Sequence, residues 1–203
     1  MNSLNENLGQ KPLVPLLDPD DFTPGYRETV EKVRSRTGHI SNSARATAHG
    51  EELAAATRHF LESTWILGDL PREFRALIRY KVSATNTCFY CSAHQLGYLK
   101  KMGIGEEKIR NINEFAQHPA FDDRERAALA FAEAMTLDAS NIPDDTADNF
   151  VAQFSPKERI EIAIVAAGMG MLNKLNDSLR IPVDDSSLDI AAALPEYARE
   201  FSG

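Results

Sequence analysis

From residue 25 onward, apolar residues recur every three to four positions between Gly, Pro, Asn and Asp residues. This spacing predicts amphipathic helices, and the residues between them predict helix ends. The apolar stripes that carry the prediction are Leu53, Ala56, Phe60 and Leu67; Phe74, Leu77, Ile78 and Val82; Ala128, Phe131, Ala132 and Met135; and the run that follows Ser155, Pro156 and Glu158 through Met171. The pattern therefore predicts an all-α fold, a helical bundle of about eight to ten helices.

A strand is the competing interpretation for the stretch around Ile78 to Ala84, where apolar residues alternate. Arg79 and Lys81 lie between them and no hairpin partner follows, so the helix is favoured. A short internal repeat supports paired helices: Pro71-Arg72-Glu73 and Pro156-Lys157-Glu158 each open an apolar segment. Proline followed by an acidic residue is typical of helix starts. We predict an internal duplication of two packed α-hairpins, each with a turn into a shorter helix.

The first 24 residues carry Pro12, Pro15, Pro19 and Pro24 among short apolar pieces. Proline at this density blocks helix interiors and central strands. We predict an extended proline-rich arm over residues 1–24, lying on its own or a neighbouring subunit, and a single all-α domain over residues 25–203. A solvated tail is the alternative for the arm.

Charge narrows the classes of partner. With 22 Lys and Arg residues against 30 Asp and Glu residues, the net charge is -8, which repels nucleic acid and anionic lipid. The longest apolar run, Ile162 to Leu172, is about half of what a membrane-spanning helix needs. The N-terminus lacks the pattern of a secretory signal. We therefore expect no nucleic-acid partner, no membrane partner and a cytoplasmic location.

The segment Asn86-Thr87-Cys88-Phe89-Tyr90-Cys91-Ser92-Ala93-His94 holds both cysteines of the chain. Asn86 or Thr87 can cap a helix, which would place Cys88 in the first turn and Cys91 on the same side. A helix start stabilises a thiolate, and Cys-x-x-Cys pairs serve thiol attack followed by disulfide closure. His94 is close enough in sequence to hold or relay the thiol proton.

Two other interpretations of the cysteines stay open. A zinc site could use both cysteines and His94 with His118 as fourth ligand, but no second ligand pair has suitable spacing. The cysteines could also be small core residues. The remaining histidines, His39 among them, lack nearby partners in sequence, and the acidic pair Asp184 and Asp185 has the character of a solvated loop. No flavin, nicotinamide or calcium motif is present, so we predict no cofactor and no metal.

The stretch PREFRALIRYKVSATNTCFYCSAHQLGYLKKMGI resembles the carboxymuconolactone decarboxylase superfamily, in particular its alkylhydroperoxidase D-like branch. The later stretch FSPKERIEIAIVAAGMGMLNKLNDSLRIPVD is similar to the second part of longer members, and the two together cover about residues 53–185. The resemblance implies an all-α fold with an internal duplication and a homo-oligomer, a trimer or hexamer. It also implies thiol peroxidase or disulfide reductase activity, with Cys91 reacting with peroxide and Cys88 as its disulfide partner.

The chain departs from the family pattern at two positions. The family has a glutamate twelve residues before the first cysteine, where this chain has Ala76, and its histidine falls one residue later, where this chain has Gln95. On a helix, one residue turns a side chain by about 100°, so His94 should be rotated from the family position. Glu73 or Glu161 could replace the missing carboxylate in a proton relay.

The function hypothesis is a peroxidase-type, antioxidant oxidoreductase that cycles the Cys88–Cys91 pair and reduces hydroperoxides or partner disulfides. Its partners are a small-molecule peroxide and an unidentified thiol or dithiol reductant, because the chain has no internal electron source. A decarboxylase-type lyase acting on a small lactone or keto acid is one alternative. A non-enzymatic redox sensor is another.

Overall fold

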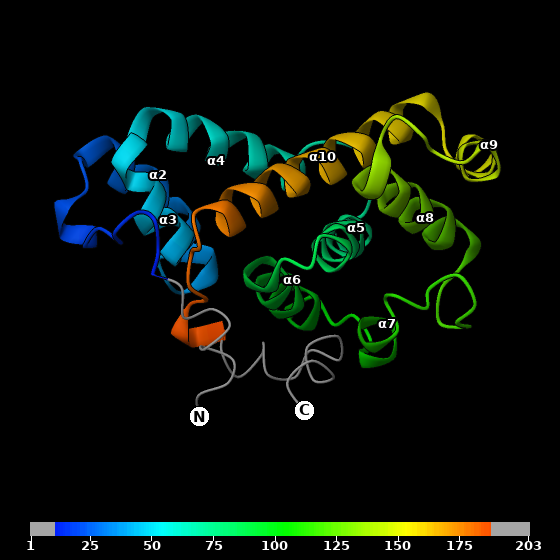
Figure 1. The fold of residues 1–203 in the computed structure, drawn as a ribbon, viewed down its shortest axis with the longest axis horizontal. Coiled ribbons are helices and arrows are strands. Elements are labelled where there is room, and N and C mark those ends of the chain that lie inside the picture. Colours follow the sequence, from blue (N-terminus) through cyan, green and yellow to red (C-terminus); the bar gives the residue numbers. More distant parts are fainter. Residues whose placement is uncertain (1–10, 188–203) are drawn as a thin grey trace.

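The computed structural model describes residues 11–187, and the first ten residues of the predicted arm lie outside this range. Within it, nine α-helices, two short 3-10 helices and no strand are found (Figure 1), which confirms the all-α prediction. The helices are η1 (Pro19–Asp21), α2 (Pro24–Thr37), α3 (Asn42–Thr47), η2 (Ala48–Gly50), α4 (Glu51–Ile66), α5 (Arg72–Thr85), α6 (Phe89–Lys101), α7 (Glu106–Arg110), α8 (Asp123–Asp138), α9 (Asp144–Gln153) and α10 (Pro156–Ser178). None of these helices combines the length and the apolar character that crossing a membrane requires.

Local chemistry starts the long helices where the sequence predicts. Ser155 caps α10 and forms a capping box with Glu158, in which each side chain bonds the other's backbone amide. Asp122 and Glu125 do the same for α8. Such reciprocal bonds satisfy amides that have no partner inside the helix.

Helix α5 lies at the centre of the main bundle, between α6, α8 and α10 (Figure 1). Every residue from 75 to 84 is buried, including Arg79 and Lys81. The main core collects apolar side chains from α5, α6, α8 and α10.

A second, smaller core joins α2 and α3 to the start of α4. Tyr26 packs edge-on against Phe22 and donates its hydroxyl to the carbonyl of Ala44 at 2.8 Å. Val30 and Ala54 complete its buried apolar contacts. Because the two cores are separate clusters, the space between them is free to form a cavity.

The described part of the arm lies on the chain's own body. The amide of Leu13 donates to the carbonyl of Leu179 at 3.1 Å, and the amide of Leu17 donates to the carbonyl of Arg45 at 3.3 Å. Phe22 is buried in the smaller core, whereas Leu13 is exposed. The arm thus ties the α2–α3 region to the end of α10.

Helices α4 and α10 pack together along one side of the molecule (Figure 1). Gly168 permits this approach, because a Cβ atom there would lie 3.2 Å from Cε1 of Phe60. The predicted α4 stripe is nevertheless largely exposed, with Leu53 at 80% and Leu67 at 64%. Ile160, Ile164 and Met171 form a second exposed stripe on α10.

The two Pro-x-Glu segments do start helices, α5 and α10, that pack on one another. The expected turn into a shorter helix is present only in the first: α5 ends and α6 begins at Phe89. In the second, the helix continues without a break from Pro156 to Ser178.

Candidate functional site

The junction between α5 and α6 sets the position of both cysteines. Cys88, not Asn86 or Thr87, is the N-cap of α6, so the predicted cap is wrong. The reason is that both candidates are used elsewhere. Thr87 takes the left-handed conformation (φ 54°), and the side chain of Asn86 reaches across to α10.

The two sulfurs lie together in the first turn of α6. The amide of Cys91 donates to Sγ of Cys88 at 3.4 Å, and both residues are buried free thiols. Burial raises the pKa of the Cys88 thiol far above its ordinary value, and the hydrogen bond and charge of Cys91 raise it further. Cys88 therefore keeps its proton at neutral pH.

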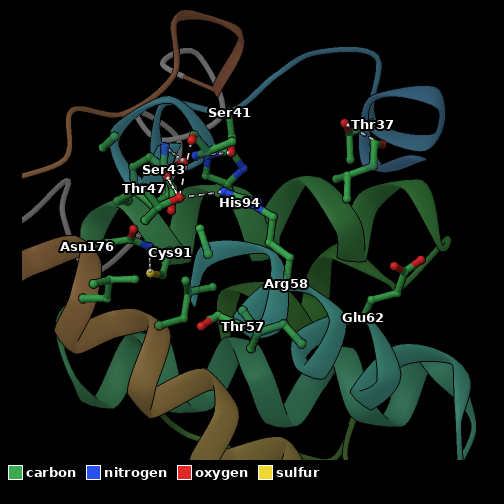
Figure 2. A pocket seen from close by; sticks show the side chains of 18 of the residues that line it. Thr37, Ser41, Ser43, Thr47, Thr57, Arg58, Glu62, Cys91, His94 and Asn176 are labelled. Atoms are coloured by element: carbon green, nitrogen blue, oxygen red, sulfur yellow. Dashed lines mark hydrogen bonds between the residues drawn. The ribbon is translucent and has the colours of Figure 1, made fainter. Parts of the chain in front are cut away.

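Two asparagines of α10 close the junction from the opposite side. Asn176 donates to Sγ of Cys91 at 3.4 Å (Figure 2), and Asn173 accepts from Asn86 at 2.8 Å. Asn173 also donates to Oγ of Ser83 at 3.3 Å. Both asparagines are buried. Our sequence reasoning missed them, although polar residues recurring three apart within an apolar helix were the available signal.

His94 faces a charged network at the far end of the site. Its Nε2 lies 3.0 Å from Oδ2 of Asp184, and Nε2 of His39 lies at the same distance from the same oxygen. The amide of Asn42 donates to the other oxygen at 2.6 Å. The predictions that His39 lacks an acidic partner and that Asp184 lies in a solvated loop are wrong, because Asp184 is buried and the chain brings the two together across 145 residues.

The charge of Asp184 is stabilised by these contacts. Burial opposes ionisation, but the hydrogen bond and charge of His94, the amide of Asn42 and the contact with His39 outweigh it and lower the pKa of the carboxyl group. The two histidine nitrogens and the Asp184 oxygen, one ligand atom from each residue, lie within 4.8 Å of one another. Together His39, His94 and Asp184 could also hold a divalent cation. The zinc set of both cysteines, His94 and His118 is not assembled, since among residues 11–187 the possible ligands that gather are His39, His94 and Asp184.

A cavity of about 620 Å³ occupies the space between the two cores. It falls within the size range of small-molecule sites. Cys91 and His94 line it, so the predicted rotation does not turn His94 away from the site. Cys88 is not part of the described wall and lies behind Cys91 with no exposed surface. Most of the wall is apolar and comes from α2, α3, α4, α6 and α10. Figure 2 labels some of its polar members.

The structure does not bring the two proposed relay carboxylates to the cysteines. Glu161 accepts from the backbone amides of Asp69 and Leu70, at 3.0 and 3.1 Å, and so fixes the turn between α4 and α5. Gly68 is required there, because a Cβ atom would lie 2.5 Å from this carboxylate and its φ is positive. Glu73 is exposed at the start of α5. Ala76 is fully buried in the main core.

Part of the chain, including both cysteines and His94, is similar to a known family. Residues 51–134 match the model of the carboxymuconolactone decarboxylase family. The chain is 25% identical over 113 residues to the uncharacterized protein YdfG of Bacillus subtilis (strain 168), which covers 55% of this chain and 73% of that protein.

Two solved structures share the fold along most of their length. A variant of the debrominase Bmp8 in complex with 2,3,4-tribromopyrrole superposes with a TM-score of 0.80 at 23% identity, covering 90% of this chain and 98% of that one. An uncharacterized peroxidase-related protein from Ralstonia eutropha JMP134, an alkylhydroperoxidase AhpD core, gives 0.77 at 17% identity, covering 90% and 97%. Residues 51–134 are thus similar to the carboxymuconolactone decarboxylase family, and the chain shares the fold of the alkylhydroperoxidase AhpD core.

Proposed function

We propose that the chain is a thiol-dependent oxidoreductase that reduces a hydroperoxide bound in the cavity. One observation carries the proposal: Cys91 lines the cavity, while Cys88 lies behind it and contacts it through the first turn of α6. This order suits a cysteine that meets the substrate and a second that closes the disulfide. It also agrees with the roles that the family resemblance implies.

In the proposed reaction, the Cys91 thiolate attacks the terminal oxygen of the hydroperoxide. The O–O bond breaks, the alcohol leaves with one proton, and Cys91 becomes a sulfenic acid. The Cys88 thiol then attacks the Cys91 sulfur, the S–OH bond breaks, and the leaving hydroxide takes the Cys88 proton as water. An external thiol or dithiol supplies two electrons and two protons to restore the pair. The cycle suits a reducing compartment such as the cytoplasm.

Neighbouring groups support these proton steps. Asn176 donates to Sγ of Cys91 and would stabilise its thiolate. His94, which lines the same cavity, would take the Cys91 proton, and Asp184 would hold the resulting imidazolium. The raised pKa of Cys88 keeps its proton in place until the sulfenic acid forms.

The test is a pair of cysteine variants. Cys91→Ser should abolish reduction of an alkyl hydroperoxide, and Cys88→Ser should leave a trappable sulfenic acid at Cys91 after one equivalent of oxidant. Thiol counting and peptide mass measurement distinguish the two. Retained turnover in the double variant would favour the lyase alternative, and disulfide formation without turnover would favour the redox sensor.

Reductive dehalogenation is a second candidate, favoured by the apolar cavity beside Cys91. The similar debrominase has been solved with a brominated pyrrole. The chemistry is balanced when the two thiols become one disulfide, the carbon–halogen bond becomes carbon–hydrogen, and hydrogen halide is released. Halide release from a brominated pyrrole, measured beside hydroperoxide consumption on the same reduced sample, separates the two candidates.

We also propose a homo-oligomer, a trimer or hexamer, assembled through the exposed stripes of α4 and α10. Monomers rarely expose apolar rows of this kind, and closed symmetric assemblies are the usual way to cover them. Light scattering should give a multiple of the 22.5 kDa chain. The double variant Ile160→Glu, Ile164→Glu should reduce the mass to that of one chain. Leu137→Glu, at an exposed position on α8, serves as the control. A monomeric unmodified chain contradicts the proposal.

A further inference from the structure

Helix α5 carries three buried cations, Arg75, Arg79 and Lys81, of which only Arg79 lines the cavity. Lys81 pairs with Glu133 at 2.6 Å and with the side-chain oxygen of Asn113 at 3.1 Å. Arg79 is equally buried, at 3% exposure, yet no carboxylate of residues 11–187 lies within salt-bridge distance of it. Burial lowers its pKa to about 10, with Tyr98 and Cys91 opposing the change, so it stays charged at neutral pH. A buried cation without a counter-ion destabilises the folded protein, which indicates that Arg79 has an anionic partner outside the described chain.

The guanidinium is held by Thr64 and Trp65, and these contacts leave one of its donors unpaired. Nη1 donates to Oγ1 of Thr64 at 2.9 Å, and the carbon of the group lies 4.4 Å from the centre of the Trp65 ring. Nε is buried and has no hydrogen-bond partner in the described structure. A guanidinium offers five N–H donors in a planar fork that matches a carboxylate. Arg79 and Trp65 both line the cavity, so the unpaired guanidinium has a ligand space beside it.

The cavity wall is positively charged, whereas the protein as a whole is negatively charged. The chain carries a net charge of -8, but the described wall holds the three arginines Arg58, Arg72 and Arg79 against one carboxylate, Glu62. Between these groups the wall is apolar, with Leu61, Met169 and Leu172 among its members. Such a wall suits an amphiphile with an anionic group.

We propose that the cavity binds apolar molecules that carry a carboxylate, with the carboxylate held by the guanidinium of Arg79 in the same cavity as Cys91. For the thiol chemistry proposed above, and resting on it, the substrate class becomes hydroperoxides of fatty acids or similar amphiphilic acids. Gln95, at 2% exposure, lines the same cavity, and its Oε1 lacks a donor among the described residues. It offers an acceptor for the O–H of a hydroperoxide or of its alcohol product. The rival role for Arg79 is counter-ion to the Cys91 thiolate alone.

Binding can be measured without turnover, because Trp65 is the chain's single tryptophan and stacks on Arg79. The fluorescence of the reduced protein is titrated with octanoic acid and, separately, with its methyl ester at neutral pH, and calorimetry repeats both. The acid should bind about tenfold more tightly, as expected for a charge-assisted hydrogen-bonded pair. Equal affinity for acid and ester in the unmodified chain overturns the proposal.

Variants assign the preference to Arg79. Arg79→Met should lose the acid preference and keep ester binding, and Arg79→Lys should retain part of it. Arg110→Met, at an exposed position on α7 outside the cavity wall, should leave it intact. Circular dichroism checks folding, and the lysine variant carries the test if the methionine variant unfolds. An unchanged acid preference in both Arg79 variants, with only the pH dependence of Cys91 alkylation moved, establishes the rival role and overturns the proposal.

The two proposals fail separately. Acid-selective binding without hydroperoxide turnover supports the ligand class and refutes the thiol function. Turnover of a neutral hydroperoxide as fast as its carboxylic analogue, with no acid-selective binding, supports the function and refutes the ligand class.

Discussion

Helices α5 and α10 begin alike and then diverge. Each starts at a Pro-x-Glu segment, and the two helices pack against one another. Helix α5 ends at Thr85 and is followed by α6, whereas α10 continues without a break to Ser178. The broken stretch carries the two cysteines at the new helix start. The unbroken stretch faces them with Asn173 and Asn176.

The difference shows how a redox site is built from two similar helices. A break supplies the free amides and the helix dipole that a reactive sulfur needs. It also leaves polar backbone and side chains inside the protein, which must be satisfied. Helix α10, which is continuous, supplies hydrogen-bond partners through Asn173 and Asn176. These bonds offset the loss of helical hydrogen bonds where α5 ends.

The largest effect on stability should come from removing Asn173, the α10 residue that hydrogen-bonds the end of α5. Asn173→Ala deletes the bonds to Asn86 and Ser83 at a fully buried position, and we expect the free energy of unfolding to fall by about 2 to 3 kcal/mol. Urea denaturation measures it. Lys174→Ala, one residue along at an exposed position, should stay within about 0.5 kcal/mol. Equal losses in both variants would mean that α10 does not support the break specifically.

A second effect is the pH dependence that the break creates. The folded state raises the pKa of Cys88 above its ordinary value of 9.0. Above that pH the unfolded chain loses this proton and the folded chain keeps it, so stability present below pH 9 falls as pH rises further. We expect a loss of about 1.4 kcal/mol per pH unit from this group. Urea titrations at alkaline pH, under reducing conditions, should show a smaller slope for Cys88→Ser; identical slopes contradict the assignment.

The smallest effect concerns the residue that turns the chain at the break. Thr87 is exposed and β-branched, yet its φ is 54°, a region that favours glycine. Thr87→Gly should therefore stabilise the protein by up to about 1 kcal/mol. Thr85→Gly, still inside α5, should destabilise by about the same amount. Thermal unfolding of the two variants compares them; a loss at position 87 would show that its strain is compensated.

The features of α5 and α10 that depend on neighbouring residues could be predicted from the sequence. Apolar spacing, the capping residues and the Pro-x-Glu starts predicted the long helices, because these signals act within a few residues. The Cys-x-x-Cys pair and its histidine were visible for the same reason. The cap itself was missed, since Asn86 is drawn away by Asn173, a residue 87 positions later.

The rest of the site depends on contacts that spacing cannot reveal. His39 and Asp184 are 145 residues apart and meet only in the folded chain. Glu161 has the apolar sequence neighbours expected of a buried relay acid, but it is only half-buried, and the amides of Asp69 and Leu70 donate to its carboxylate. The α4 stripe had the correct period, and only the fold shows that it is largely exposed. Periodicity identifies an apolar face and not what covers it.

The position of Cys88, behind Cys91 and without exposed surface, has a kinetic consequence for the proposed cycle. Oxidant and reductant must both reach the sulfur pair through the cavity that Cys91 lines, and one cannot enter while the other's product remains. Each half-reaction is then complete before the next begins. Steady-state rates should follow a ping-pong pattern, with parallel double-reciprocal lines as the second substrate is varied.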